Sequence, residues 1–474
     1  MRLRVRNGTV ITKDGSSRAD IVCRDGTIEQ VGGVQPGSDA IDEEIEASGL
    51  LVFPGFIDPH VHSRDPGLTH KEDFAHSTRA AAAGGATTIC EMPNAIPPVS
   101  SAAIFEARAA HHELVASVDF GLWGIALGPE NLAEIAGLFA AGVVGVKLFW
   151  GYALHRSTQM LVYNLSDAEP ADLIQPPTAG EVLEVCREVA RAGGLLAAHC
   201  EDRGVIDAAE RSLGRPIETY AELLQIRPDT AEAVSIAIAG ELSAATGCRF
   251  HVVHAASARG IQAVRRAQSA GARLTAETCP HYLTLSADDF PTLGVMMKVF
   301  PPIRERADQA ALWQAVEDGT ISSIGSDHAP HTRAEKALGL ASAPAGVAGL
   351  ETMVPLLVDA MLAGRLSAER LAAVLSEDTA RLYGLWPRKG SLAPGADADF
   401  TLIDPESTTL VDSTRLHSKE PQTPWQNRRL RGAVDRTILR GDVIARGGEV
   451  LVERRGRLVR AEHTPNPTGA ASLA

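Results

Sequence analysis

The sequence predicts an α/β protein: a (β/α)8 TIM barrel with a small β-sandwich formed by the N- and C-terminal segments. Two observations predict this fold. Between residues 54 and 384, apolar runs rich in β-formers alternate with alanine-rich stretches of helical character. Residues 1–53 and 385–462 instead contain short alternating runs with tight turns, and neither segment is long enough to build a core alone. We therefore expect the two ends to pair into one small sandwich beside the barrel domain, residues 54–384.

The N-terminal segment has strand character from its first residues. "LRVRNGTVI" and "ADIVCRDGTIEQVGG" alternate with a period of two, and the pairs "NG" and "DG" are typical of hairpin turns. The C-terminal segment has the same character in "GSLAPGADADFTLID" and "RGAVDRTILRGDVIARGG". The last residues, 463–474, are rich in proline, glycine, alanine and serine, so we expect a flexible tail.

Eight barrel strands are expected between these ends. The first is "LLVFPGFID", and the others are "ATTICEM", "SVDFGLWGI", "VVGVKLF", "GLLAAH", "RFHVVHA", "RLTAET" and "ISSIGSD". Stretches such as "KEDFAHSTRAAAAGG" and "TAGEVLEVCREVARAGG" supply the helices between them. Residues 150–177 and 331–349 interrupt this rhythm after the fourth and eighth strands. They are either lids over an active site or irregular surface insertions without a role.

The composition is that of an ordinary globular protein. The chain has 474 residues, of which 45% are hydrophobic and 22% are charged. Its formal net charge of -14 argues against a nucleic acid or an anionic membrane as partner. No apolar run is long enough to cross a membrane, and the N-terminus lacks the apolar core of a signal peptide. The six cysteines are scattered without paired spacing, which fits free thiols in the cytoplasm.

Ligand-type side chains recur at the C-terminal ends of the expected strands, where a TIM barrel places its active site. The two histidines of "DPHVHSRD" face the same way because residues i and i+2 of a strand share a side. One such histidine alone is more often a structural residue, but a set at the correct end of five strands is hard to obtain by accident. The set comprises His60, His62, Lys147, His199, His254 and Asp327.

These residues predict a centre for two metal ions. Four imidazoles and a carboxylate suit zinc or another borderline divalent ion. A protonated lysine cannot bind a metal, but reaction of Lys147 with CO₂ produces a carbamate whose two oxygens can bridge two ions. We expect the first histidine pair and Asp327 to hold one ion. The second pair, His199 and His254, holds the other, with carbamylated Lys147 between them.

Several motifs, in this order, resemble those of the cyclic amidohydrolases, which include dihydroorotase, allantoinase and hydantoinase. They include "PGFIDPHVHSRDPG", "AAAAGGATTICEMPN", "GVKLFWGY", "AHCED", "HVVHAAS", "KVFPPIRE" and "GSDHAPHT", and the resemblance covers nearly the whole chain. It implies a hydrolase that opens a small cyclic amide or ureide, using two metal ions bridged by a carbamylated lysine and a hydroxide. We also expect a homo-oligomer, either a dimer or a tetramer.

The expected chemistry follows from the metal centre. Two metal ions lower the pKa of a bridging water molecule, and one of them polarises the carbonyl that is attacked. Asp327 can accept the proton of that water and return it to the departing ring nitrogen. The product is a ring-opened carbamoyl or ureido acid. In dihydroorotase-like enzymes the same machinery also runs toward ring closure.

Residues beside the metal motifs favour dihydroorotase. Arg64, Asn94 in "EMPN" and His331 in "DHAPH" match the positions that hold the carboxylate of dihydroorotate in that enzyme. A guanidinium, an amide and an imidazole around one anion form a sound carboxylate site. Alternatively, Arg64 pairs with Asp65 or Glu72 and only braces its loop.

Two other residues depart from the dihydroorotase pattern. Phe300 in "KVFPPIR" stands where dihydroorotases carry a ring-reading asparagine, and Tyr152 occupies the place of a hydantoinase tyrosine that stabilises the oxyanion. The function expected is hydrolysis of (S)-dihydroorotate to N-carbamoyl-L-aspartate, with allantoinase or hydantoinase (dihydropyrimidinase) as the alternative. A remote alternative is a non-catalytic scaffold, which should have lost metal ligands that this chain keeps.

Overall fold

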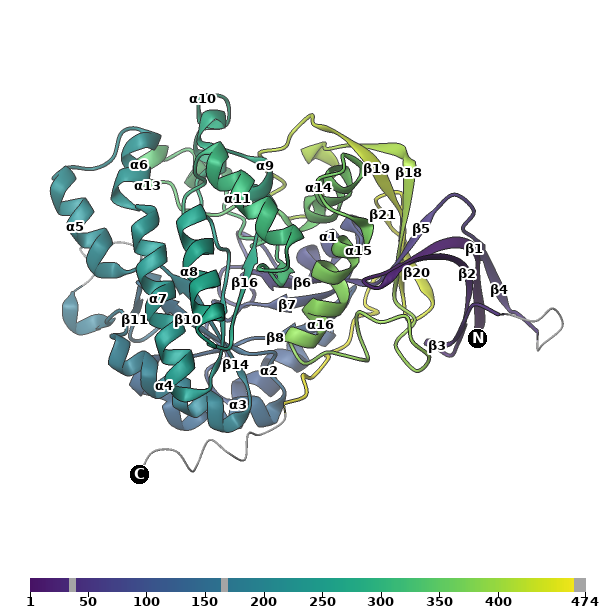
Figure 1. Cartoon of the computed structure of the whole chain (residues 1–474), viewed down its shortest axis with the longest axis horizontal. Coiled ribbons are helices and arrows are strands. Elements are labelled where there is room, and N and C mark those ends of the chain that lie inside the picture. Colours follow the sequence, from purple (N-terminus) through teal and green to yellow (C-terminus); the bar gives the residue numbers. More distant parts are fainter. Residues whose placement is uncertain (34–39, 163–168, 464–474) are drawn as a thin grey trace.

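The two ends of the chain pair with each other in one mixed sheet. The structure, a computed structural model, describes residues 1–33, 40–162 and 169–463. Nine strands form this sheet, and its purple N-terminal and yellow-green C-terminal strands lie side by side (Figure 1). The strands are β1 (Arg2–Thr12), β2 (Gly15–Arg24), β3 (Thr27–Val31), β4 (Glu43–Glu46), β5 (Leu51–Pro54), β18 (Phe400–Leu410), β19 (Arg429–Leu439), β20 (Asp442–Arg446) and β21 (Glu449–Val450).

The junction between the two ends is the antiparallel pairing of β5 with β18. Val52 lies opposite Leu402 in this register, and both side chains are fully buried. Alternate residues of β1 and β2 join the same apolar cluster, as the period-two pattern predicts. The predicted pairing of the ends is therefore confirmed. The hydrogen-bonded ladder is continuous across them, and the exact domain limits stay a prediction.

Parallel strands form the centre of the molecule. One sheet contains β6 (Phe56–Val61), β7 (Ala86–Glu91) and β8 (Asp119–Leu122) in that order. The second contains, in order, β9 (Gly124–Ile125), β10 (Val146–Trp150), β14 (Leu195–Cys200), β15 (Arg249–Val252), β16 (Leu274–Thr278) and β17 (Ser323–Ile324). Seven of the eight predicted apolar runs overlap these strands as expected. The first predicted run, residues 50–58, is divided instead: β5 joins the nine-stranded sheet, and β6 begins only at Phe56 and continues to Val61. Only Trp123 separates β8 from β9, so these two continue one predicted run.

Helices follow the strands and cover their outer side in Figure 1. The longer ones are α1 (Phe74–Gly84), α2 (Ala102–Glu113), α3 (Ile135–Ala141), α4 (Ala179–Ala192), α5 (Arg203–Leu213), α6 (Tyr220–Ile226), α7 (Asp229–Thr246), α8 (Ala258–Ser269), α11 (Arg306–Glu317) and α14 (Leu350–Leu362). Local signals fix their ends. Asp73 caps α1 by accepting a hydrogen bond from the backbone N–H of His76, and Thr178 with Glu181 forms a capping box at α4.

The two interruptions have secondary structure of their own. Between residues 150 and 177, β11 (Ala153–His155) pairs with β12 (Leu161–Val162) and with β13 (Leu173–Ile174). Residues 163–168 of this stretch lie outside the described residues, as does the predicted tail after residue 463. The 331–349 stretch contains two single-turn helices, α12 (Arg333–Lys336) and α13 (Gly339–Ser342). A lid function stays a prediction for both.

Short helices complete the part of the chain that the structure describes: α9 (Pro280–Thr284), α10 (Phe290–Leu293), α15 (Ala368–Ala372) and α16 (Asp378–Leu382). All six cysteines are buried free thiols. Among the described residues, no helix combines the length and the apolar character that crossing a membrane requires.

Candidate active site

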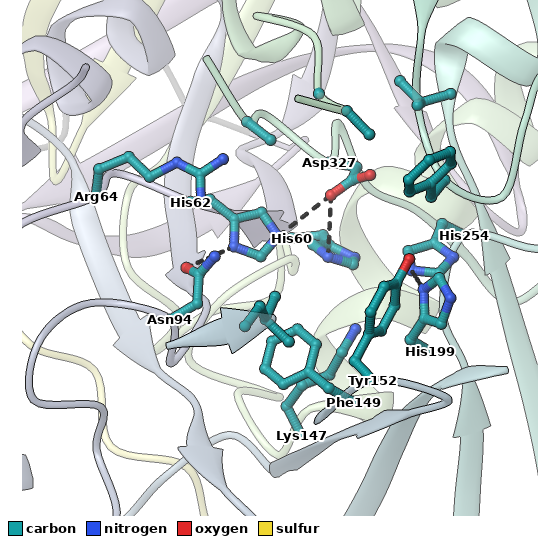
Figure 2. Close-up of a pocket in the computed structure, with 16 residues that line it drawn as sticks. His60, His62, Arg64, Asn94, Lys147, Phe149, Tyr152, His199, His254 and Asp327 are labelled. Atoms are coloured by element: carbon teal, nitrogen blue, oxygen red, sulfur yellow. Dashed lines mark hydrogen bonds and ion pairs between the residues drawn. The ribbon is translucent and has the colours of Figure 1, made fainter. Parts of the chain in front are cut away.

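A cavity at the C-terminal ends of the parallel strands gathers every predicted site residue except His331 (Figure 2). His60 belongs to β6 and His199 to β14, whereas His254 and Asp327 directly follow β15 and β17. Two of these residues have left-handed backbone, with φ of 41° at His254 and 47° at Asp327. Non-glycine residues rarely adopt this conformation, and such strain concentrates at functional sites. The structure therefore gathers these side chains at the strand ends, and their role as a site stays a prediction.

One half of the cavity contains the histidines of the first strand and Asp327. The Oδ1 atom of Asp327 lies 3.3 Å from Nε2 of His60 and 3.2 Å from Nε2 of His62. The other ring nitrogens face away from the cavity: Nδ1 of His60 hydrogen-bonds Glu277, and Nδ1 of His62 lies 2.8 Å from Oδ1 of Asn94. Both rings thus present Nε2 to the same carboxylate.

The other half contains His199 and His254. Nδ1 of His199 lies 3.1 Å from Nε2 of His254, and both rings are buried. Nε2 of His199 lies 2.8 Å from Glu201, which also forms a buried ion pair with Arg227. Because Glu201 orients the outer nitrogen of His199, the inner nitrogen is left as a lone-pair donor.

Lys147 lies at the floor of the cavity and points toward the histidines in Figure 2. Its side chain is only 1% exposed. Burial lowers the pKa of Lys147 to about 8, because a low-dielectric site disfavours the ammonium. A fraction of the side chain is therefore a neutral amine near neutral pH, which is the form that reacts with CO₂.

The donor groups fit divalent metal ions. Burial lowers the pKa of His62 to about 4 and that of His254 well below the usual range, so both rings are neutral at pH 7. Burial alone would raise the pKa of Asp327, but His60 and the hydrogen bond from His62 outweigh it and hold that pKa well below its usual range. Ligand atoms of His60, His62 and Asp327 lie within 4.8 Å of one another. Neutral imidazoles around an ionised carboxylate are typical metal ligands.

Arg64 lies beside this metal-ligand group and is buried, with φ of 61°. Its guanidinium lies 3.4 Å from Nε2 of His331, so the structure brings these two predicted substrate residues together. Among the described residues, no carboxylate forms an ion pair with Arg64. Asp65 pairs with His111 at 3.0 Å instead, and Glu72 lies 3.4 Å from His328. The proposed loop-bracing partners of Arg64 are thus engaged elsewhere.

Three predicted residues remain, of which Asn94 lies beside His62 on the side of Arg64 (Figure 2). The Phe300 ring lies 3.7 Å from the guanidinium carbon of Arg227, and Tyr152 lies against His199 with ring centroids 4.7 Å apart. Asn94 lines the cavity, but its carbonyl oxygen is bound to His62. Asn94 therefore orients a histidine in this structure.

Sequence reasoning missed three residues behind the ligands: Glu277, Glu201 and Arg227. Glu277 is within β16, and Glu201 directly follows β14, so both acids occupy the same strand ends as the histidines. The available sequence signal was an acidic residue at the end of an apolar run, in "LTAET" and "AHCED". No sequence signal placed Arg227 here, because it reaches the site from the end of α6.

Known proteins resemble this chain over almost its whole length. The sequence pattern of the amidohydrolase family matches residues 51–444. A protein named allantoinase from Rubrobacter xylanophilus is 38% identical over 462 residues, covering 97% of each chain. A protein named L-hydantoinase from Paenarthrobacter aurescens is 33% identical and covers 95% of this chain and 96% of its own.

Solved structures agree with these sequence comparisons. The structure of L-hydantoinase (dihydropyrimidinase) from Arthrobacter aurescens superimposes with a TM-score of 0.88 at 32% identity, covering 97% of this chain and 99% of that one. A D-hydantoinase structure gives a TM-score of 0.87 at 27% identity, with coverages of 98% and 100%.

Proposed function

The chain belongs to the amidohydrolase family, and we propose that it hydrolyses a ring C–N bond of a cyclic ureide, as an allantoinase or a hydantoinase. The observation that carries this proposal is the convergence of four histidines, Lys147 and Asp327 in one cavity at the strand ends. In the reaction, water adds across the amide: its oxygen joins the carbonyl carbon, the C–N bond breaks, and a proton passes to the ring nitrogen. The product is a ureido acid.

The dihydroorotase expectation is not supported by the relatives. Those quoted above are named allantoinase and hydantoinase, which favours the alternative that Phe300 and Tyr152 had raised. Arg64 favoured dihydroorotase in the sequence because it is at a position that dihydroorotases use to bind a carboxylate. A guanidinium can also donate hydrogen bonds to neutral oxygens, so its presence does not identify the substrate. Side-chain identity alone did not distinguish these acceptors.

The metal ligands are proposed in two groups. His60, His62 and Asp327 would hold one divalent ion, for which zinc is the best fit to the donors, and His199 with His254 would hold a second. Lys147, if carbamylated, would supply an anionic ligand to the same centre. Such ions, when bound, lower the pKa of water and polarise a carbonyl.

The protein's own groups perform the proton transfer and the charge stabilisation. We assign Asp327 as the proton shuttle: it takes a proton from the attacking water and delivers it to the ring nitrogen. Tyr152, on the wall beside His199, is the proposed donor to the oxyanion. The close approach of Asp327 to two imidazoles supports its ionised, proton-accepting state at neutral pH.

Arg64 and His331 form the proposed contact to a substituent on the ring. Arg64 is a buried cation without a described carboxylate partner, so a carbonyl oxygen on a substituent of the substrate ring would satisfy it. The ureido side chain of allantoin carries such an oxygen, and unsubstituted hydantoin has no substituent. Phe300 supplies an apolar wall for the ring, and Asn94 acts by holding His62.

The test compares allantoin, hydantoin, dihydrouracil and dihydroorotate with the wild type and Arg64→Met. Allantoin or an uncharged hydantoin should be turned over far better than dihydroorotate. Loss of a charge-assisted hydrogen bond should lower kcat/KM for allantoin by about ten- to a hundredfold and leave unsubstituted hydantoin within about threefold. Turnover of none of the four rings by the metal-loaded enzyme would contradict the proposed reaction.

We also propose that the two parallel sheets close into one barrel, which would be the core of the catalytic domain. The backbone N–H of His62 donates to His328 O at 2.9 Å, and Val61 forms a parallel bridge with His328, at the junction between β6 and the chain after β17. At the other junction, Trp123 N–H donates to Glu91 O at 3.0 Å, between β7 and the residue that joins β8 to β9.

Homo-oligomer formation and a cytoplasmic location stay predictions.

A further inference from the structure

A second cavity, distinct from the one at the strand ends, is lined by five arginines. Its volume is about 360 Å³, and it lies where α9, α11 and the end of α14 meet the first residues of β19. The arginines are Arg306, Arg365, Arg428, Arg429 and Arg431. All five are exposed, and they come from three separate parts of the chain. Three of them lie in the run "RRLR" at residues 428–431, and the fold adds Arg306 and Arg365.

The positive charge in this cavity is only partly compensated. Arg306 pairs with Asp288 at 2.8 Å, and Arg431 pairs with Asp359 at 2.8 Å. Arg365, Arg428 and Arg429 form no ion pair with any described residue. Two carboxylates, Asp289 and Asp359, also line the cavity, so its five guanidinium groups leave an excess of positive charge there, in a chain whose formal net charge is -14. An anion bound between the guanidinium groups would offset that excess.

The rest of the cavity is preformed. Trp313 lies on its floor, where the indole N–H donates to Leu283 O at 2.8 Å and fixes the ring. Asp359 accepts hydrogen bonds from both the backbone N–H and the side chain of Arg431, which holds the start of β19 in place. The arginines therefore surround a fixed, concave floor of small-molecule size, and an extended acidic surface of another protein would not enter it.

The geometry points to a binding site for a small phosphate-bearing anion in this arginine-lined cavity. Guanidinium groups bind phosphate oxygens through paired, charge-assisted hydrogen bonds, and several of them together match a group with more than one negative charge. The site is separate from the proposed catalytic cavity and shares no lining residue with it.

The experiment is a calorimetric titration of the metal-loaded enzyme with sodium pyrophosphate, at constant ionic strength set with sodium chloride. The test variant is Arg428→Gln/Arg429→Gln. The matched control is Arg211→Gln/Arg266→Gln, which removes two exposed arginines of α5 and α8 that also form no ion pair with a described residue. Metal analysis after each titration shows whether pyrophosphate has stripped the active-site ions.

We expect saturable binding at one site with a Kd below about 1 mM, weakened by about tenfold or more in the test variant and unchanged in the control. Two outcomes overturn the proposal. One is the absence of saturable binding to the wild type. The other is equal binding of pyrophosphate by both variants, because the anion would then bind elsewhere. A change in the oligomeric state of the test variant without a change in its affinity counts as this outcome. A parallel titration with citrate distinguishes phosphate recognition from general attraction of polyanions: equal affinity for citrate also contradicts it.

Discussion

Glu277 accepts a hydrogen bond from Nδ1 of His60 and thereby fixes the nitrogen that His60 presents to the active-site cavity. The Glu277 carboxylate is fully buried and also accepts a hydrogen bond from the hydroxyl of Tyr383 at 3.1 Å. His251 lies 3.5 Å from the same oxygen. With Nδ1 protonated and held by a carboxylate, Nε2 of His60 carries the lone pair that a metal requires.

Replacement of Glu277 by Gln should therefore weaken the first metal site while the metal ligands themselves stay intact. Loss of such an orienting carboxylate commonly lowers metal affinity by about 10–100-fold. The measurement is the metal content per chain as a function of the free zinc concentration. The control is Asp318→Asn, which changes a surface ion pair at the end of α11. Wild-type affinity in the Gln variant would exclude a positioning role for Glu277.

Lys147→Ala should lose most of the bound metal and nearly all activity. The reason is that the proposed carbamate is the only ligand that reaches both ions. Added short carboxylic acids should restore part of the activity, because a carboxylate can occupy the space that the side chain vacates. Metal analysis and turnover are measured together. A Lys147→Ala enzyme that keeps two ions and full activity would refute the bridging role.

Asp327→Asn should reduce kcat by about 10²–10⁴-fold, the usual effect of removing a general base. An amide cannot accept the proton of the attacking water at neutral pH, although it has almost the same size. Some loss of metal is also expected, since Oδ1 faces both His60 and His62. Kinetics are therefore compared at equal metal occupancy. Activity within threefold of the wild type at that occupancy would contradict the assignment.

Lys389→Met should destabilise the fold at a place remote from the site. Lys389 is 1% exposed and binds three buried carboxylates: Asp119 at the start of β8, Asp397, and Asp399 beside β18. It thus joins the parallel strands to the nine-stranded sheet. Removing one partner of a buried ion cluster costs about 3–5 kcal/mol in the free energy of unfolding. Urea unfolding of both enzymes measures this difference.

The pH dependence of this deficit has a definite sign. Burial raises the pKa of Asp399 even in the presence of Lys389, and because the lysine is the main group that lowers this pKa, its loss should raise the pKa of Asp399 further in the folded state. A group whose folded pKa is raised destabilises the fold as pH rises, so the deficit should be larger at pH 8 than at pH 5.5. Arg388→Met is the control: Arg388 binds the same carboxylate, Asp397, at 3.0 Å, but its own side chain is 47% exposed, so its ion pair is accessible to solvent. An equal effect of the two substitutions would contradict a special role for the buried cluster.

The sequence by itself indicated where most strands lie along the chain and which side chains would meet at their C-terminal ends. The end segments alternate between apolar and polar residues, whereas the strands in the middle are apolar throughout. Both patterns report which faces of a strand are buried, and they can be read from neighbouring residues alone. Because parallel strands end at one edge, His60, Lys147 and His199 could be assigned to one site without knowing any distance. The structure places these side chains in the same cavity.

Only the tertiary structure decided which side chains contact each other behind and beside those ligands. Glu277 is 217 residues from His60 in the chain, and Arg64 is 267 residues from His331. Arg64 was open to a bracing role in the sequence, and the fold assigns the possible partners Asp65 and Glu72 to other groups. Such contacts depend on how helices and loops pack around the sheets, which periodicity does not encode. Local sequence patterns therefore indicate at which strand end a metal-binding side chain lies. The packing of the fold determines the hydrogen-bond partner and the protonation state of that side chain.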